Sequence, residues 1–211
     1  MRNKNMESKL SARDLSIISI FTVITAVLAQ ISIPLPFTPV PISFGLVAVY
    51  ISGIVLKPKH AAYSQICYLL LGTIGIPVYS GFRGGLAVLF GPTGGYLLVY
   101  PIMAWVVSMA LNSKKSRQAE RIQSKGIVLF KSAIAICIAH LLLYLGGTTW
   151  LSITTGNTFY ASLVLAVFPF IPMDVLKILF CIFGIVPIRW RLISRNLLVL
   201  DNKQLDLAEE K

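Results

Sequence analysis

Charged residues are scarce in this 211-residue sequence, where Asp, Glu, Lys and Arg together make up 13% of the chain. Soluble domains carry roughly 25% charged residues. By contrast, 56% of this chain is hydrophobic, and its mean hydropathy is +0.78. So little charge and so much apolar sequence exclude an ordinary soluble domain and indicate an integral membrane protein made of spanning helices.

Acidic residues are the scarcer of the two charged classes, with 8 of them against 19 basic residues and a formal net charge of +11. Such an excess could indicate a nucleic-acid-binding protein, but the basic residues lie in short segments between apolar runs and not on a polar domain. Orientation in a membrane and attraction to anionic lipid account for the charge. We therefore expect membrane lipid, and no nucleic acid, as a partner.

The common signatures of catalysis and metal binding are missing. The three cysteines, Cys67, Cys137 and Cys181, lie inside apolar runs without CxxC spacing, which is typical of small buried hydrophobes. The sequence has no HExxH, GxSxG or P-loop motif, and its apolar runs hold a single acid, too few for a metal site. His60 and His140 lie on different predicted spans, and a lone His140 is more often a core histidine. We expect no metal and no cofactor, and a membrane enzyme is the weaker alternative.

Six apolar runs predict six transmembrane helices. The 14 polar residues at the N-terminus lack the small-residue cleavage motif of a signal peptide, so we expect the first span to be retained. The predicted spans cover approximately residues 15–33, 42–56, 61–78, 93–111, 127–145 and 159–186. The predicted organisation is a segment 1–14, a membrane domain 15–187 and a tail 188–211.

The distribution of basic residues predicts the orientation of these helices. If residues 1–14 are cytoplasmic, 16 of the 19 lysines and arginines fall in cytoplasmic segments and one, Arg83, falls in an outer loop. The other two, Lys131 and Lys177, lie inside spans. Because cytoplasmic loops are enriched in Lys and Arg, we expect a multi-pass membrane protein with both termini in the cytoplasm.

An acid and a base stand one helical turn apart inside the sixth apolar run, FPFIPMDVLKILF. Asp174 and Lys177 are spaced i and i+3, so they share one face of a helix. Ionisable residues inside a membrane are costly and mark functional sites by default. A structural ion pair, or a lysine that reaches the interface, is the alternative. The pair suits a small polar ligand with both donor and acceptor edges.

Three nearly uncharged loops are expected on the same outer side as this pair. Residues 34–44 contain four prolines, which favour an extended path. Residues 79–96 contain six glycines, which permit turns or close approach to a ligand, and residues 146–158 are uncharged. Arg83 could bind a ligand anion or remain a solvent-exposed loop charge. The aromatic residues of these loops could wall a cavity or form an interfacial belt.

Three stretches closely resemble one family. PFTPVPISF, GIPVYSGFRGGLAVLFGPTGGYL and FPFIPMDVLK are similar to BioY, the biotin-binding S components of energy-coupling factor (ECF) vitamin transporters. The resemblance extends from about Leu15 to Pro187. It implies an all-α fold of six membrane helices and high-affinity capture of biotin from outside. It further implies a transmembrane coupling protein and two cytoplasmic ATPases as partners. An S component for another vitamin is the alternative within this fold.

The resemblance also implies site residues. The acid and lysine of the family fall on Asp174 and Lys177, which would bind the ureido head group of biotin. Residues expected near the ligand are Tyr96, Gly94, Gly95, Thr38, Phe44, Tyr144 and Trp150, with Arg83, hydroxyls or backbone N–H groups for the carboxylate.

S components often carry an AxxxA pattern on the first span, where the coupling protein docks. In this chain the nearest spacings of small residues involve Thr22 with Ala26, and Thr25 with Ala29. Small residues let helices approach closely, so these four are the predicted docking residues. Ordinary packing within the bundle is the alternative.

Overall fold

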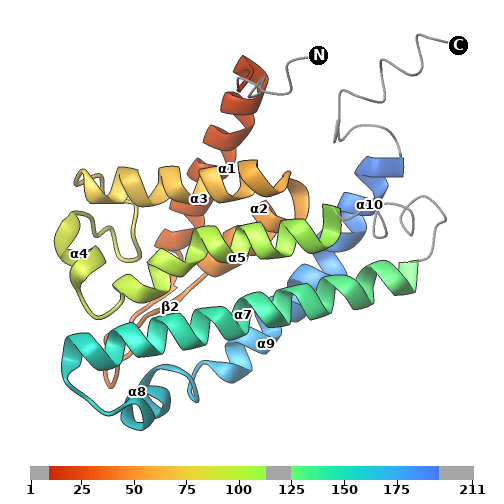
Figure 1. Cartoon of the computed structure of the whole chain (residues 1–211). Helices are drawn as coiled ribbons and strands as arrows, with labels where there is room; N and C mark the ends of the chain where they lie inside the picture. Colours follow the sequence, from red (N-terminus) through yellow and green to blue (C-terminus); the bar gives the residue numbers. More distant parts are fainter. Residues whose placement is uncertain (1–9, 113–124, 195–211) are drawn as a thin grey trace, which may run out of the picture.

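The protein is a bundle of helices joined by short connections, apart from one small β-ribbon (Figure 1). The computed structural model describes residues 10–112 and 125–194. Within these residues, four helices are long and apolar enough to cross a membrane: Ala12–Gln30, Gly94–Asn112, Gly126–Thr155 and Ile171–Arg191. Most of the predicted N-terminal segment, residues 113–124 between the fourth and fifth predicted spans, and most of the predicted tail lie outside the described residues.

The elements follow one another in the order of the predicted spans. They are α1 (Ala12–Gln30), β1 (Ser32–Ile33), β2 (Ile42–Ser43), α2 (Gly45–Val55), α3 (Pro58–Thr73), α4 (Leu86–Phe90), α5 (Gly94–Asn112), α7 (Lys125–Thr155), α8 (Phe159–Ala166), α9 (Ile171–Phe180), the π-helical turn η1 (Cys181–Ile185) and α10 (Val186–Ser194).

Helix α1 begins three residues before the predicted span because a capping box starts it. The Ser11 hydroxyl accepts a hydrogen bond from the Asp14 amide at 3.2 Å, and the Asp14 carboxylate accepts one from the Ser11 amide at 3.1 Å. After α1, the proline-rich connection follows the predicted extended path. Its two ends pair as the antiparallel strands β1 and β2, with Ser32 opposite Ser43 and Ile33 opposite Ile42.

The prediction of a loop over residues 146–158 is wrong, because α7 continues to Thr155. Glycine is a poor helix former in water, but here two glycines let α5 and α7 pack closely. A Cβ added at Gly147 would lie 2.2 Å from the Tyr96 ring, and one added at Gly146 would lie 2.6 Å from Val99. The hydroxyls of Thr149, Thr154 and Thr155 bond to carbonyls one turn back along the helix. Only residues 156–158 connect α7 to α8.

The sixth predicted span is not one continuous helix. Helix α8 ends at Ala166, before Pro169, and α9 begins at Ile171 with Pro172 in its first turn. Proline is tolerated in the first turn of a helix, where its missing N–H would have no partner. This break places Asp174 in the first turn of α9. The helix then runs through η1 into α10, past the predicted end at residue 186.

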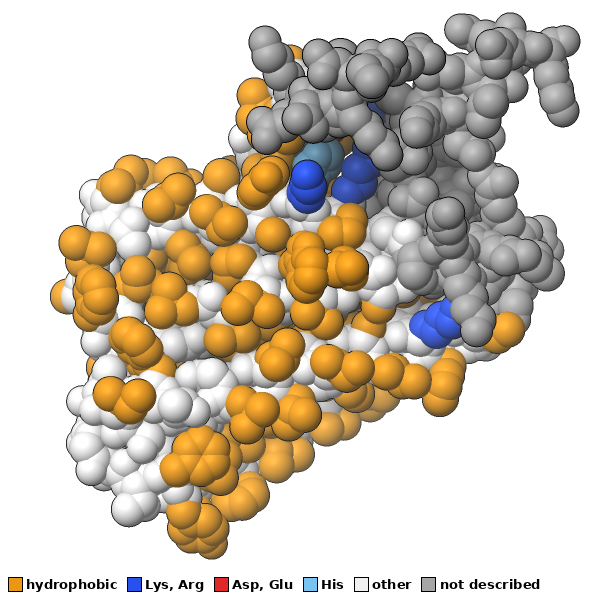
Figure 2. Space-filling view, in the orientation of Figure 1, with side chains coloured by type: hydrophobic (Ala, Val, Ile, Leu, Met, Phe, Trp, Pro, Cys, Tyr) orange, Lys and Arg blue, Asp and Glu red, His pale blue; other side chains and the backbone are white. Residues whose placement is uncertain are grey.

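The elements have two common ends. Figure 1 shows α10, the end of α5 and the start of α7 toward the upper right, with α4, the β-ribbon and α8 toward the lower left. We call these the α10 end and the α8 end. Figure 2 shows hydrophobic side chains spread over the visible face, and its lysines and arginines gathered near the α10 end.

Helix α5 occupies the centre of the bundle, between α3 and α7 (Figure 1). Met103, Ala104 and Val107 of α5 are fully buried, as are Val49 and Ile54 of α2. At the α10 end, the buried guanidinium of Arg189 donates hydrogen bonds to the carbonyls of Ile54 and Leu111, and it thereby ties α10 to the ends of α2 and α5. These contacts hold α9 and α10 against the rest of the bundle and so position the acid–base pair.

Candidate binding site

The Asp174–Lys177 pair exists as the sequence predicts. Lys177 Nζ donates to Asp174 Oδ1 at 3.0 Å, and each residue is only 5% exposed. The two residues lie on one face of α9 because they are three positions apart. A buried ion pair is costly to desolvate and needs further hydrogen bonds to its remaining donors and acceptors.

Tyr144 of α7 supplies such a bond to the carboxylate, and His140 and Tyr50 lie next to it. Tyr144 donates its hydroxyl to Asp174 Oδ2 at 2.8 Å. His140, one turn earlier on α7, places Nε2 3.4 Å from the same oxygen, without the alignment of a hydrogen bond. Its Nδ1 lies 2.5 Å from the Tyr50 hydroxyl of α2. The acid, its lysine, two tyrosines and a histidine therefore form one connected polar cluster.

A small cavity adjoins this cluster at the α8 end. Its volume is about 60 Å³, and its walls come from the β-ribbon, α2, α5, α7 and the α8–α9 segment. The lining residues are Val40, Pro41, Ser43, Leu46, Tyr96, Tyr100, Leu143, Tyr144, Ala166, Phe170, Asp174 and Lys177. Most of the wall is apolar or aromatic, with the charged pair as its polar part. This composition is that of a small-molecule site, in which a few polar groups fix the ligand in an apolar pocket.

The chemistry of the cluster favours binding over catalysis. A carboxylate accepts about four hydrogen bonds and an ammonium donates three. Tyr144 and Lys177 occupy two of the acceptor positions of Asp174, so acceptor capacity remains for a ligand N–H. Lys177 likewise keeps donors for a ligand carbonyl. Among the described residues, no group of three or more His, Cys, Asp or Glu side chains could hold a metal ion.

Gly94 and Gly95 were predicted near the ligand, and the structure gives both a packing role beside the cavity. A Cβ at Gly94 would lie 1.6 Å from the Leu89 carbonyl oxygen, and one at Gly95 would lie 2.1 Å from Cβ of Trp150. Trp150, of α7, donates its indole N–H to the Gly91 carbonyl at 2.9 Å. Neither glycine nor Trp150 lines the cavity itself. They hold the start of α5, and with it Tyr96, against α7.

Three other predicted residues lie away from the cavity lining. Arg83 is exposed and donates to the Ser80 carbonyl at 3.1 Å. Thr38 is buried, and its hydroxyl accepts a bond from the Val40 amide. Phe44 is partly exposed, immediately before α2. Thr38 and Phe44 flank the residues of the ribbon that do line the cavity, whereas Arg83 belongs to the glycine-rich loop.

The glycine-rich loop is fastened to the end of α1 by one side chain. Gln30 donates to the Val78 carbonyl at 2.9 Å and accepts a bond from the Phe82 amide at 2.9 Å. Phe82 has a φ of 55°, a left-handed conformation that is uncommon for a residue other than glycine. Backbone hydrogen bonds between Tyr79 and Arg83, and one from the Tyr79 hydroxyl to the Leu69 carbonyl, also hold the loop in a defined conformation.

The predicted docking residues of α1 face the interior of the bundle. Thr22, Thr25 and Ala29 are buried, and Ala26 is half-buried. The Thr22 hydroxyl donates to the Ser64 carbonyl of α3, and the Thr25 hydroxyl accepts a bond from Gln65. In this chain the small side chains let α1 approach α2 and α3 closely, and docking of a coupling protein at these residues stays a prediction.

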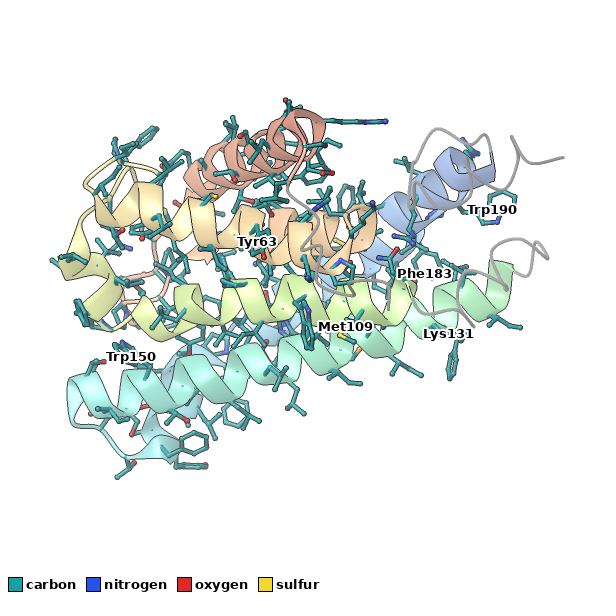
Figure 3. The ribbon with its side chains drawn as sticks, turned by 45° about the horizontal axis from the view of Figure 1, so that its top comes forward. Tyr63, Met109, Lys131, Trp150, Phe183 and Trp190 are labelled. Atoms are coloured by element: carbon teal, nitrogen blue, oxygen red, sulfur yellow. The ribbon has the colours of Figure 1, made fainter. Side chains whose placement is uncertain are left out.

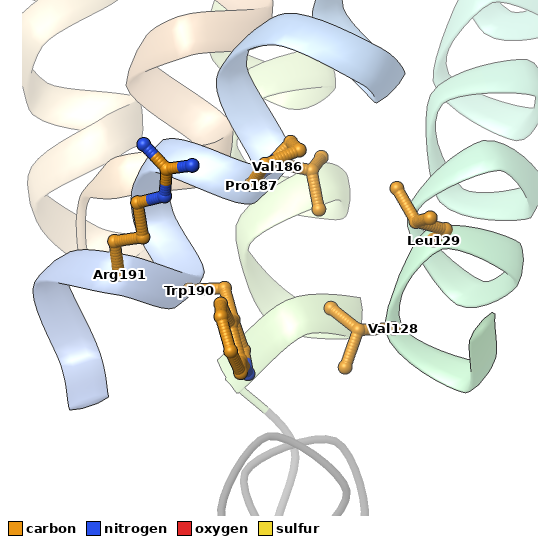
Figure 4. A pocket seen from close by; sticks show the side chains of 6 residues that line it. All are labelled: Val128, Leu129, Val186, Pro187, Trp190 and Arg191. Carbon is orange, nitrogen blue, oxygen red and sulfur yellow. The ribbon is translucent and has the colours of Figure 1, made fainter. Parts of the chain in front are cut away.

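A second hollow lies at the α10 end, between the start of α7 and α10 (Figure 4). It is lined by Val128, Leu129, Val186, Pro187, Trp190 and Arg191. Val128 precedes Tyr144 by 16 residues along α7, a distance of about 24 Å at ~1.5 Å per residue. Figure 3 shows the same separation, with Trp150 and Trp190 at opposite ends of the bundle. The side chains that line this hollow include no hydrogen-bond acceptor, so none of them could accept a hydrogen bond from a ligand N–H.

Sequence reasoning did not assign His140, Tyr50 and Tyr100 to the site. His140 and Tyr144 are spaced i and i+4, which places them on one face of a helix, and this spacing is the signal that could have joined His140 to the predicted Tyr144. Tyr50 and Tyr100 lie in apolar runs without any distinguishing pattern. Only the packing of α2 and α5 brings them toward Asp174.

The chain is similar to known biotin transporters along most of its length. The model of the BioY family matches residues 2–195. The biotin transporter BioY2 of Lactococcus lactis subsp. cremoris is 38% identical over 176 residues, which cover 83% of this chain and 90% of that protein. The probable biotin transporter BioY of Pyrococcus horikoshii is 33% identical over 168 residues, which cover 80% of this chain and 91% of that protein.

A solved structure has the same fold. The S-component for biotin from an ECF-type ABC transporter aligns with a TM-score of 0.73 and 27% identity, over 86% of this chain and 91% of that one. The family match covers the ribbon, the glycine-rich loop and the Asp174–Lys177 pair. The chain belongs to the BioY family.

Proposed function

We propose that this protein captures biotin at the outer surface of the cell membrane, as the substrate-binding S component of an ECF transporter. The observation that carries the proposal is the buried Asp174–Lys177 pair beside a tyrosine-lined cavity in a chain of the BioY family. The names of the relatives and of the solved structure specify biotin as the substrate. The protein is a transporter component and not an enzyme.

The ligand matches the cluster group by group. The ureido ring of biotin presents two N–H donors and one carbonyl acceptor. Asp174 accepts from the N–H edge, and Lys177 donates to the carbonyl. The apolar sulfur ring and valerate chain lie against Tyr96, Tyr100 and Tyr144. The terminal carboxylate binds Arg83, hydroxyls or backbone N–H groups of the loops at the α8 end.

Binding requires the site to open and enlarge. The cavity of about 60 Å³ is well below the roughly 300 Å³ at which ligand pockets begin. The glycine-rich loop is the element that moves, because glycines absorb large changes of backbone angle. Release of Gln30 from Val78 and Phe82 frees the loop from α1. The described conformation thus corresponds to a contracted site.

Six spans with both termini in the cytoplasm are the topology that we propose. Four of the spans are the long apolar helices, of which the last runs from α9 into α10. The shorter helices α2 and α3 are the other two spans. The basic residues Lys57 and Lys59 lie at the junction of α2 and α3, as the positive-inside rule expects of a cytoplasmic connection.

A cysteine-labelling experiment tests this topology. Cys67, Cys137 and Cys181 are first replaced by Ala, and then Arg83→Cys or Lys59→Cys is added. A membrane-impermeant maleimide should label the Arg83→Cys variant in intact cells and the Lys59→Cys variant only after permeabilisation. The reverse pattern refutes the orientation.

Energy for transport comes from partners, because the sequence has no P-loop. We propose a transmembrane coupling protein and two cytoplasmic ATPases. Co-purification of these proteins with the chain, and loss of uptake when they are deleted, is the expected result.

The function is tested by titration of the purified, detergent-solubilised chain with biotin after removal of any co-purified ligand. Calorimetry should show saturable one-to-one binding in the nanomolar range. Tryptophan fluorescence gives a second readout: Trp150 packs against Gly95, next to Tyr96, whereas Trp190 lies at the other end (Figure 3). We therefore expect Trp150→Phe to remove most of the fluorescence response. If the folded protein does not bind biotin but binds another vitamin, then that vitamin is the substrate and the proposal of biotin is wrong.

A further inference from the structure

His140 lies between the Tyr50 hydroxyl and the Asp174 carboxylate and contacts both. Its Nδ1 is 2.5 Å from the Tyr50 oxygen, and its Nε2 is 3.4 Å from Asp174 Oδ2. The imidazole is buried, and the Tyr144 ring packs against it edge-on with centroids 4.3 Å apart. Three elements, α2, α7 and α9, therefore fix the position of one ring.

These contacts select one tautomer of the imidazole. In neutral histidine one ring nitrogen donates and the other accepts, and the hydrogen bond at one nitrogen decides the role of the other. If Nδ1 donated to Tyr50, then Nε2 would present a lone pair to the Asp174 carboxylate, which is repulsive. If Tyr50 donates to Nδ1, then Nε2 carries the proton and faces Asp174 with its N–H.

The charge balance favours the same neutral form. Asp174 and Lys177 carry opposite charges 3.0 Å apart, so the pair is balanced. A doubly protonated His140 would add a buried positive charge without a second acid, since Asp14 is the only other acid among the described residues and it contacts His60. An unbalanced buried charge is strongly unfavourable.

We propose that His140, held in its Nε2–H tautomer by Tyr50, is a positioning residue that orients the Asp174 carboxylate for the ligand. The role rests on the proposed binding of biotin at Asp174. Tyr144 and Lys177 take two of about four acceptor positions of the carboxylate, and the Nε2–H of His140, which faces Oδ2 at 3.4 Å, takes a third once the ligand is bound. One position then remains, and it points a single ligand N–H at Asp174. The 3.4 Å contact shortens when the ligand binds, as hydrogen bonds of unliganded sites commonly do.

The tautomer can be measured without any ligand. The sequence has two histidines, so protein labelled with ¹⁵N-histidine gives two sets of ring signals, and His60→Gln assigns them. We expect His140 to show a protonated Nε2 and an unprotonated Nδ1, and Tyr50→Phe to shift it toward a mixture of forms. A protonated Nδ1 in the wild-type protein, or no effect of Tyr50→Phe, overturns the proposal.

Two matched substitutions test the positioning role. In His140→Gln the side-chain amide reaches the place of Nε2 and keeps a donor for Asp174, whereas in His140→Asn it reaches only the place of Nδ1. We expect His140→Gln to bind biotin within about 3-fold of the wild type. We expect His140→Asn to bind roughly 10- to 100-fold more weakly, the range for a lost hydrogen bond to a charged group. His60→Gln is the control and leaves affinity unchanged.

The outcomes separate positioning from packing. Equal weakening by His140→Gln and His140→Asn, in proteins with wild-type thermal midpoints, means that the imidazole only fills space and overturns the proposal. Unchanged affinity in both variants overturns it as well. If the folded wild-type protein binds no biotin, then the proposed function is refuted. The tautomer measurement uses no ligand, so its result is independent of that outcome.

Discussion

Replacement of Asp174 by Asn tests whether the buried acid binds the ligand. The amide keeps the shape of the carboxylate and can still accept the Tyr144 hydroxyl, but it removes the charge that balances Lys177 at 3.0 Å. It also replaces one acceptor oxygen with an N–H₂ donor. The ligand N–H loses a charged acceptor, and the Lys177 ammonium, 5% exposed, loses its counter-ion.

The magnitude follows from burial. Removal of one partner from a desolvated, hydrogen-bonded charge pair costs about 2–5 kcal/mol of binding. At about 1.4 kcal/mol per tenfold, the affinity for biotin should fall by a factor of roughly 30 to 5,000. The same change should lower the free energy of unfolding by about 3–5 kcal/mol, because an uncompensated charge is left in the bundle.

The assay is calorimetric titration with biotin, together with a thermal melt of each variant in detergent. Asp14→Asn is the matched control, because this acid caps α1 far along the chain from the site and should leave affinity unchanged. Asp174→Leu combined with Lys177→Met removes both charges. This double variant should be more stable than Asp174→Asn and should still fail to bind.

Two results would refute the reasoning. Unchanged biotin affinity in folded Asp174→Asn removes the acid from the site. A double variant no more stable than Asp174→Asn shows that the unpaired charge of Lys177 is not the source of the instability.

Two further predictions concern the elements around the site. Hydrogen exchange of residues 79–93 should slow on addition of biotin, because the glycine-rich loop closes over the ligand; equal protection with and without biotin rejects the loop as a lid. Gly95→Ala should lower the free energy of unfolding by about 1–3 kcal/mol, since its Cβ would lie 2.1 Å from Cβ of Trp150. Gly126→Ala, whose Cβ meets nothing within 4 Å, is the control, and equal thermal midpoints for the two variants contradict the packing argument.

Much of the helical arrangement could be predicted from the apolar composition of the spans and from the positions of the prolines. The extended path of the proline-rich connection follows from the fixed φ angle of proline, whereas α3 begins at Pro58, three residues before the predicted span. The end of α7 could not be predicted, because residues 146–155 have the glycines and threonines of a loop. Close contact with α5 made them helical, and such a contact between distant segments has no local signal.

The residues of the site also fall into those whose role the sequence indicates and those whose contacts only the structure shows. Asp174 and Lys177 could be found because charges are rare in apolar runs and a helix of known period pairs residues three apart. Thr22, Thr25 and Ala29 show the opposite case. A stripe of small residues allows close approach to any neighbour, and the sequence does not distinguish a partner protein from the helices of the same chain that contact these residues in the structure.

The residue pattern alone indicates that the chain resides in a membrane, and that one acid and one base share a helical face. These properties depend on composition and on helical period, which are local. Only the tertiary structure decided which groups surround that pair. The packing of α2 and α7 against α9 joins Tyr50, His140 and Tyr144 to Asp174. Hydrogen bonds extend only about 3 Å, whereas the residues that they join here are up to 90 positions apart in the chain, as Tyr50 and His140 are.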